Sequence, residues 1–253
     1  MNKMNQSNQD QLYIMGKNSV FEALQSERSI NKIYIAEGIQ KSSLHKLLTL
    51  AKMKNIITQY SPKKRLDQMT QNGNHQGIVA SVAAYDYVEL NEIVTNAKSK
   101  EKQPFLVLLD EIEDPHNLGS ILRSCDVVGV DGVIIPKRRS VGLTTTVSKT
   151  SAGAIEHVPV SRVTNMVQTI DWLKDEGFWI VGTDASAEQM YHEIDYKLPI
   201  VIVIGSEGKG ISRLLKEKCD FMVKLPMMGH VNSLNASVAA GIMLYEVYRN
   251  RGF

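Results

Sequence analysis

The feature that most constrains the fold is a regular alternation of apolar stretches and helical patterns after residue 104. Short apolar stretches predict strands, and between them apolar side chains recur at the three- and four-residue spacing of a helix. Each strand is followed by a helix, so we expect an α/β domain with a parallel sheet covered on both faces. The expected strands are 105–109, 132–135, 178–181, 200–204 and 221–225, and the expected helices are 118–128, 166–173, 211–218 and 235–249.

A smaller α/β pattern occupies residues 13–85. It predicts strands at 33–35, 56–57 and 77–82 and helices around 20–24 and 44–51. Residues 1–12 are rich in Asn and Gln, and we expect them to form a disordered tail. Residues 98–104 are charged and carry no apolar side chain, so we expect a linker at 86–104 and the larger domain at 105–253.

Basic side chains are concentrated in one part of the smaller domain. Residues 38–65 contain seven Lys or Arg side chains and no acidic one. Lys63, Lys64 and Arg65 follow Pro62 and are expected in a loop, where they would bind RNA phosphates. The alternative is a solvated helix face without a ligand. The net charge of the whole chain is only +2, which does not by itself indicate nucleic acid.

Composition disfavours several classes of protein. No apolar run approaches the ~20 residues of a membrane helix, and the N-terminal segment lacks the apolar core of a signal peptide. Cys125 and Cys219 lie far apart without CxxC spacing, so we expect reduced thiols and no metal site. We therefore expect a cytoplasmic protein without a membrane partner.

Three strand ends carry the polar and glycine residues that a ligand site needs, because parallel sheets bind ligands at the carboxyl ends of their strands. The segment 205–210 reads GSEGKG between an apolar strand and a helix. It matches neither the dinucleotide nor the phosphate-loop fingerprint, nor a nucleophile elbow. Taken alone, a tight turn explains it equally well.

The other two polar segments are 225–237 and 110–123. The first is about twice as long as an ordinary connection, and its Ser233 and Asn235 could serve as helix caps. The second begins with acidic residues, has Asn117 at a position suited to the N-cap, and ends with Arg123 inside an apolar helix. Taken alone, Arg123 is more simply explained by pairing with an acid.

In this order, the three segments resemble the three signature motifs of the SpoU/TrmH family of RNA 2′-O-ribose methyltransferases. Residues 117–123 (NLGSILR) correspond to motif one, 205–210 to motif two and 225–237 to motif three. Ser120 replaces the alanine of many members. Residues 16–20 (GKNSV) and 75–80 (HQGIVA) resemble the ends of the L30e-like RNA-binding domain of members that methylate a guanosine ribose in large-subunit ribosomal RNA.

The resemblance implies a trefoil-knotted SPOUT catalytic domain and S-adenosylmethionine as the cofactor. It places Gly205, Leu225 and Leu234 around the cofactor, largely through backbone groups. It also implies a homodimer with the active site near the subunit interface. The RNA partner would be ribosomal RNA.

The same resemblance implies catalytic roles for Asn117, Arg123, Glu207, Ser233 and Asn235. A guanidinium stays protonated in proteins. We therefore expect Arg123 to hold the RNA and stabilise developing charge rather than accept a proton. Ser233 and Asn235 would orient the ribose hydroxyl, and Glu207 would fix Arg123 or Asn117.

Two alternatives stay open. The target could be transfer RNA, or the ribosomal site modified by thiostrepton-resistance enzymes. Transfer-RNA members generally lack the first domain, so residues 13–85 favour ribosomal RNA. The second alternative, an RNA-binding module without catalysis, is disfavoured because binding alone needs no cofactor loop.

Overall fold

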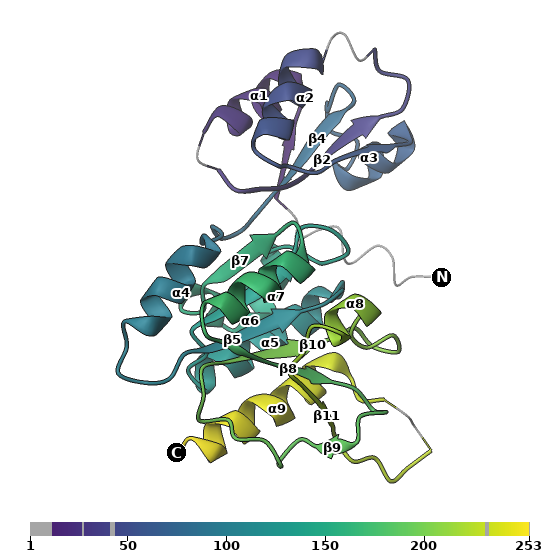
Figure 1. The fold of residues 1–253 in the computed structure, drawn as a ribbon. Helices are drawn as coiled ribbons and strands as arrows, with labels where there is room; N and C mark the ends of the chain where they lie inside the picture. Colours follow the sequence, from purple (N-terminus) through teal and green to yellow (C-terminus); the bar gives the residue numbers. More distant parts are fainter. Residues whose placement is uncertain (1–11, 27, 41–43, 231–232, 253) are drawn as a thin grey trace. The chain divides into compact units, whose positions relative to one another are not determined.

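The computed structural model describes residues 12–26, 28–40, 44–230 and 233–252 (Figure 1). The chain forms two compact units. The first comprises Met1–Asp86 together with Gly142–Ser148, and the second comprises Tyr87–Val141 and Lys149–Phe253. The expected tail lies outside the described residues except for Leu12, which begins the first strand. Lys41, part of the basic run, also lies outside them.

The first unit is built on a four-stranded sheet with the order β1-β4-β2-β3. Strands β1 and β2 pair antiparallel with β4, whereas β3 pairs parallel with β2. Helices α1 and α2 pack on one face of the sheet through a buried apolar cluster, and Leu66 of α3 packs on the other. The elements are β1 (Leu12–Met15), α1 (Lys17–Gln25), β2 (Ile30–Ala36), α2 (His45–Met53), β3 (Thr58–Ser61), α3 (Lys63–Met69) and β4 (Ile78–Val82).

The predicted loop position of the basic triplet is wrong. Lys63, Lys64 and Arg65 form the first turn of α3, and Pro62 stands at its N-cap. A proline at a helix start costs little, because the first N–H groups of a helix lack intrahelical partners anyway. All three basic side chains are exposed.

The second unit contains a seven-stranded sheet with the order β7-β6-β5-β10-β8-β11-β9. All six pairings are parallel, which confirms the predicted sheet type. Every residue of β5, β6 and β10 is buried, as expected for strands covered on both faces. The strands are β5 (Phe105–Leu109), β6 (Gly132–Pro136), β7 (Val160–Val163), β8 (Trp179–Thr183), β9 (Gln189–Met190), β10 (Ile200–Ile204) and β11 (Phe221–Lys224).

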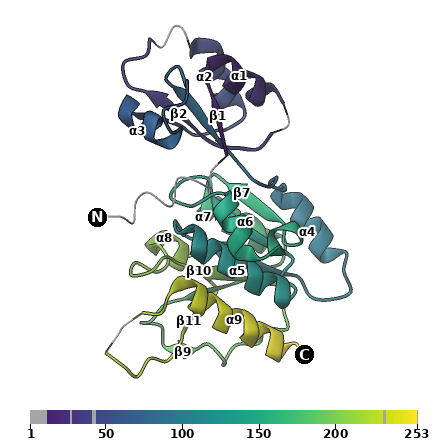
Figure 2. The same ribbon diagram turned by 180° about the vertical axis from the view of Figure 1, so that it is seen from behind.

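Helices cover both faces of this sheet. Apolar side chains of α4, α7 and α8 share one buried cluster with β5, β6, β8 and β10. Helices α5 and α9 pack against each other, and α9 also contacts β10; both are seen from in front in Figure 2. The helices of this unit are α4 (Leu90–Lys98), α5 (Pro115–Val127), α7 (Met166–Asp175), α8 (Arg213–Lys216) and α9 (Ala236–Asn250). Helix α6 (Thr145–Ser151) is divided, with residues 145–148 in the first unit and 149–151 in the second.

The segment expected as a linker, 86–104, belongs to the second unit instead. Ile93, Val94 and Ala97 of α4 are buried, and Val88 donates its backbone N–H to the carbonyl of Val160 at 2.9 Å. The amphipathic spacing of α4 outweighs the charged composition of the residues after it. Elements β7, β9 and α6 were not predicted, because their sequences are short or polar.

The strand order determines where the polar segments meet. Strand β10 lies between β5 and β8, and β11 lies on the far side of β8. The segments after β5, β10 and β11 therefore leave the same carboxyl edge of the sheet from nearby strands. Motifs separated by about 120 positions in the sequence are brought together in this way.

Candidate active site

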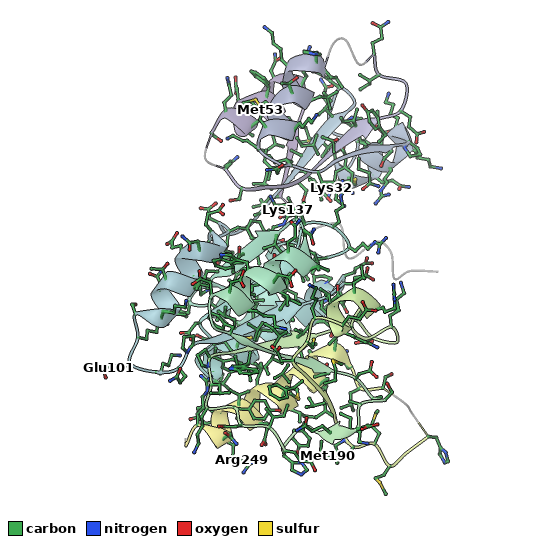
Figure 3. The ribbon with its side chains drawn as sticks, in the orientation of Figure 1. Lys32, Met53, Glu101, Lys137, Met190 and Arg249 are labelled. Atoms are coloured by element: carbon green, nitrogen blue, oxygen red, sulfur yellow. The ribbon has the colours of Figure 1, made fainter. Side chains whose placement is uncertain are left out.

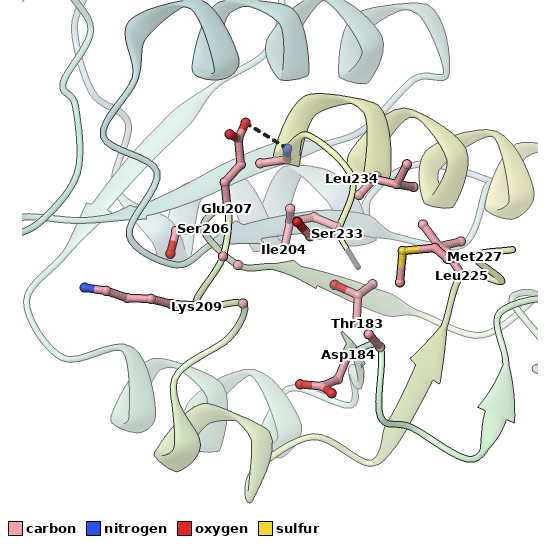
Figure 4. A pocket seen from close by; sticks show the side chains of 16 residues that line it. Thr183, Asp184, Ile204, Ser206, Glu207, Lys209, Leu225, Met227, Ser233 and Leu234 are labelled. Carbon is pink, nitrogen blue, oxygen red and sulfur yellow. Dashed lines mark hydrogen bonds between the residues drawn. The ribbon is translucent and has the colours of Figure 1, made fainter. Parts of the chain in front are cut away.

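A cavity of about 260 Å³ opens at this carboxyl edge (Figure 4). Gly205, Leu225 and Leu234, the three residues expected to contact the cofactor, all line it. So do two of the expected catalytic residues, Glu207 and Ser233. The walls come from the ends of β8 and β10, the loop after β10, the loop after β11 and the first turn of α9.

The loop after β10 folds tightly back on itself. Gly210 donates its backbone N–H to the carbonyl of Ser206 at 2.8 Å, and the two residues form an antiparallel bridge. A Cβ at Gly205 would lie 2.1 Å from the carbonyl carbon of Gly210. Gly208 and Gly210 have φ values of 80° and 65°, which favour glycine. The close contact with Gly210 by itself therefore requires glycine at position 205, and any requirement imposed by a ligand is additional.

One residue from each polar segment joins a hydrogen-bonded group that we call the Asn117–Glu207–Asn235 triangle. Asn117 donates from Nδ2 to Oε1 of Glu207 at 3.1 Å. Asn235 donates from Nδ2 to Oδ1 of Asn117 at 3.0 Å and also to Oε1 of Glu207. That carboxylate oxygen further accepts the backbone N–H of Ala236 at 3.3 Å, the dashed line in Figure 4.

The capping of α5 explains why Asn117 is available to the triangle. The prediction that Asn117 is the N-cap is wrong: Asp114 holds that position, accepts the N–H of His116 at 2.9 Å, and is followed by Pro115. Because Asp114 caps the helix, the amide of Asn117 is free to bond Glu207 and Asn235.

Asn235 has a dual role. As the N-cap of α9 it accepts, through Oδ1, the backbone N–H groups of Ser237 and Val238 at 3.0 and 3.4 Å. This capping fixes its amide so that the Nδ2 group points to Glu207 and Asn117. The cap and the site functions, considered as alternatives from the sequence, are performed by the same side chain.

Arg123 stands apart from the triangle. It lies on α5, about 240° around the helix axis from Asn117. Its side chain is exposed, and in the described part of the chain it forms no hydrogen bond or ion pair. A pairing of Arg123 with an acid, the simpler explanation from the sequence, is therefore wrong within a single chain. Glu207 fixes Asn117 and not Arg123.

The cavity also contains residues that the sequence did not indicate. Thr183, Asp184 and Ala185 line it from the end of β8, and Ser206 and Lys209 line it from the loop after β10. Asp184 pairs with Lys216 and accepts the backbone N–H of Ser186 at 2.8 Å. Hydrogen bonds from Lys216 and Ser186 lower the pKa of Asp184 to about 2. The polar end of an apolar strand, Thr183-Asp184, was the signal that could have revealed them.

The first unit carries its own positive group. The guanidinium of Arg65 and the ammonium of Lys32 each lie 5.8 Å from the ring centroid of Tyr34. Burial, and to a smaller extent Tyr34, raises the pKa of Tyr13 to about 12, while Arg65 opposes the shift. Neutral phenols beside two cations make a surface suited to anions.

Other kinds of site find little support among the described residues. No group of three or more His, Cys, Asp or Glu side chains in that part of the chain is placed to hold a metal ion. No described helix is long and apolar enough to cross a membrane. Cys125 and Cys219 are both free, and burial raises the pKa of each thiol.

Comparison with protein families assigns both units. Residues 104–245 match the model of the SpoU rRNA Methylase family. The chain belongs to the SpoU rRNA methylase family. In this SpoU chain, residues 13–88 also match the model for RNA 2′-O ribose methyltransferase substrate binding. The family is one of RNA methyltransferases, so the resemblance of the three motifs is confirmed.

Bacterial relatives of this SpoU chain are similar over nearly their whole length. YacO of Bacillus subtilis, assigned to the TrmH family of tRNA/rRNA methyltransferases, is 56% identical over 239 residues, which cover 94% of this chain and 96% of YacO. A relative with the same assignment in Staphylococcus haemolyticus is 53% identical over 242 residues, covering 96% of this chain and 97% of the relative.

Solved structures share the fold of this SpoU chain. AviRb from Streptomyces viridochromogenes, in complex with the cofactor AdoMet, aligns with a TM-score of 0.61 at 24% identity, over 99% of this chain and 94% of AviRb. The A. aeolicus TrmH/SpoU tRNA modifying enzyme aligns with a TM-score of 0.54 at 33% identity, over 64% of this chain and 84% of that enzyme. The first comparison covers both units and supports the fold of each.

Proposed function

We propose that this SpoU chain transfers a methyl group from S-adenosylmethionine to a ribose 2′-hydroxyl of RNA, and that the ribose belongs to a guanosine of large-subunit ribosomal RNA. The observation that carries the proposal is the Asn117–Glu207–Asn235 triangle beside the cavity. It draws one residue from each family motif into a single hydrogen-bonded group.

The cavity fits S-adenosylmethionine chemically. Its apolar walls, Leu225, Met227 and Leu234, suit the adenosine and the methylene groups. Two carboxylates, Asp184 and Glu207, border it from different loops and complement a cationic ligand (Figure 4). When bound, S-adenosylmethionine supplies a methyl group on a positively charged sulfur.

The triangle has a free acceptor for the ribose. Oε1 of Glu207 accepts bonds from Asn117, Asn235 and Ala236, whereas Oε2 accepts none from the described residues. We assign Oε2 to the ribose 2′-hydroxyl, which it would orient towards the cavity. Ser233, exposed at the cavity wall, would donate to or accept from the same ribose. Holding hydroxyl and methyl donor in line can contribute several kcal/mol, roughly 7–11 in favourable systems.

We propose a homodimer formed through α9 and α5. Val238, Ile242 and Tyr245 follow one another at helical spacing on α9, and their side chains are 50%, 38% and 52% exposed. Val127 on α5 is 61% exposed and lies one turn from Arg123. Contact between two copies over these faces would cover the apolar side chains. It would also give Arg123 a route to the active site of the partner, where it would hold RNA.

Ribosomal RNA is the target that the chain supports best. The first unit matches a substrate-binding model and presents exposed Lys63, Lys64 and Arg65 in α3. The tRNA-modifying enzyme from A. aeolicus aligns with only 64% of this chain. A separate basic domain suits a large, folded RNA, because each phosphate contact adds affinity through counterion release.

The test is methyl transfer from radiolabelled S-adenosylmethionine to purified RNAs. We expect label on one ribose 2′-oxygen of large-subunit ribosomal RNA and none on transfer RNA. Glu207→Gln should lower the rate strongly, while Glu217→Gln, on an exposed pair with Arg213, should leave it unchanged. Label on a base, or no label on any RNA with folded protein, would overturn the proposal; label on transfer RNA would change the target.

A further inference from the structure

We propose that Lys137, Arg138 and Arg139, in the loop after β6, form a phosphate-binding rim for the RNA strand that carries the target nucleotide. The inference rests on the proposed function and adds an RNA surface to the second unit, which the sequence analysis had not identified. We call these three residues the basic rim.

The basic rim lies at the same edge of the sheet as the candidate active site. Strand β6 pairs with β5, and β5 pairs with β10, which leads into the loop after Gly205. Neighbouring strands are about 4.8 Å apart, so the two strand spacings from β6 to β10 separate the rim and this loop by roughly 10 Å. Lys137 is labelled in Figure 3. A strand of RNA at the cavity therefore has the rim within reach of its flanking nucleotides.

A second cavity connects the two places. It has a volume of about 280 Å³ and shares Ser206, Glu207 and Lys209 with the first cavity. Its far side is formed by Glu111, which accepts a 2.9 Å bond from Nη1 of Arg139. The second cavity thus shares residues with the first cavity and includes the carboxylate that pairs with Arg139.

The backbone of the rim is held in place. The N–H of Lys137 donates to the carbonyl of Val163 at 2.8 Å. The carbonyl of Lys137 accepts a 3.3 Å bond from Nη2 of Arg162, whose guanidinium carbon lies 4.9 Å from the ring centroid of Tyr87. Because Lys137 is held through both its N–H and its carbonyl, Arg138 and Arg139 follow directly on a fixed residue at the end of β6.

The side chains of the rim are available to a ligand. Arg139 is 76% exposed even though it pairs with Glu111. Arg138 is exposed and forms no hydrogen bond or ion pair in the described part of the chain. Arginine presents a planar pair of donors that matches phosphate oxygens.

Cations and carboxylates both lie near the rim, with Arg162 and Glu89 near Lys137 and Glu111, Glu113 and Asp110 near Arg139. Burial lowers the pKa of Lys137, and the neighbouring Arg162 lowers it further, while Glu89 opposes the shift. A half-buried lysine beside another cation is stabilised by an anion. RNA supplies phosphates at regular intervals along one strand, and three consecutive basic residues can contact more than one of them.

The test measures RNA binding by Arg138→Gln and by the double variant Arg138→Gln, Arg139→Gln. The probe is a fluorescent fragment of large-subunit ribosomal RNA, titrated at several salt concentrations. We expect affinity to fall roughly three- to tenfold per arginine, and the salt slope to fall by about 0.7–0.9 for each phosphate that is no longer neutralised. Affinity for S-adenosylmethionine should not change.

Lys197→Gln is the matched control. Lys197 is exposed in the same unit but precedes β10, at the opposite edge of the sheet. Its variant should bind RNA as the wild type does. Wild-type affinity and salt slope in the double variant would overturn the basic rim while leaving the proposed function intact. Failure of the wild-type protein to methylate any RNA would instead overturn the proposed function.

Discussion

At the scale of single residues, the site depends on which side chains are relieved of structural duties. Asp114 caps α5 and so leaves Asn117 to the triangle. Asn235 both caps α9 and joins the triangle, because capping uses only its Oδ1 atom and leaves Nδ2 for Glu207 and Asn117. An N-cap contributes about 1 kcal/mol to helix stability, so replacing Asn235 would damage α9 and the site together.

Arg123→Ala tests a role in catalysis against a role in folding. Arg123 has no hydrogen-bonding or ionic partner in the described part of its own chain, so its loss should leave the melting temperature nearly unchanged. If Arg123 stabilises charge in the transition state, the single-turnover methyl-transfer rate should fall by roughly 10²–10³. Arg123→Lys should restore little, because lysine lacks the planar pair of donors. An unchanged rate in folded Arg123→Ala would remove Arg123 from the site.

Asp184→Asn tests the ion pair at the end of β8. Hydrogen bonds lower the folded-state pKa of Asp184 from 3.8 to about 2. The ionised carboxylate therefore stabilises the fold at pH values above 3.8, and this contribution disappears as the pH falls towards about 2. Urea unfolding should therefore show a constant difference between wild type and Asp184→Asn from neutral pH to about 5. The difference in unfolding free energy should shrink as the pH falls below 3.8, the ordinary pKa of the side chain. A difference that grows in acid would contradict this assignment.

At the scale of elements, the loop after β10 is the least replaceable part of the site. Gly205→Ala places a Cβ against the backbone of Gly210, so the loop must open. We expect affinity for S-adenosylmethionine to fall about tenfold or more, since 1.4 kcal/mol of distortion already gives that factor. Gly229→Ala is the control, because a Cβ there meets nothing within 4 Å and Gly229 is not among the glycines with positive φ. Calorimetric titration with both variants makes the measurement; equal affinities would show that the loop adapts.

Strand prediction succeeded where burial dominated, and helix boundaries were less certain. The uniformly apolar strands β5 and β10 were predicted at their observed bounds. Helix α8, expected over 211–218, spans only Arg213–Lys216, because Ile211 and Ser212 complete the preceding loop. The start of α5 was misplaced, since several polar residues in a row could each cap a helix and only packing selects Asp114. The polar strands β7 and β9 gave no periodic signal.

The candidate active site, like the strands and helices, was predicted from the sequence only in part. The motif pattern indicated all three members of the triangle, whereas the residues at the end of β8 and the basic rim escaped notice. Asp184 and Arg138 belong to no motif, and their place at the carboxyl edge follows only from the strand order. Local sequence patterns predict helices and turns, but which strands lie next to each other in a sheet is known only from the folded structure.

At the scale of the whole molecule, the proposed subunit assembly can be tested through the exposed face of α9. Tyr245→Glu should convert a dimer into a monomer in sedimentation experiments, because it places a charge among exposed apolar side chains of α9. Methyl transfer should be lost with the dimer if Arg123 acts across the interface. Leu214→Glu is the control, since Leu214 on α8 is 55% exposed and lies outside the proposed interface. A monomeric wild type with full activity would contradict the proposed assembly.

The trefoil knot implied by the family likewise stays a prediction. Insertion of β10 between β5 and β8, two strands formed earlier in the chain, is a strand order compatible with threading. Native chains rarely thread their loops.

The triangle has a consequence for protein synthesis. Its members come from positions 117, 207 and 235, so the third is synthesised long after the first. A nascent polypeptide in which Asn235 has not yet been added therefore has no assembled triangle, and neither has a product that terminates before this residue.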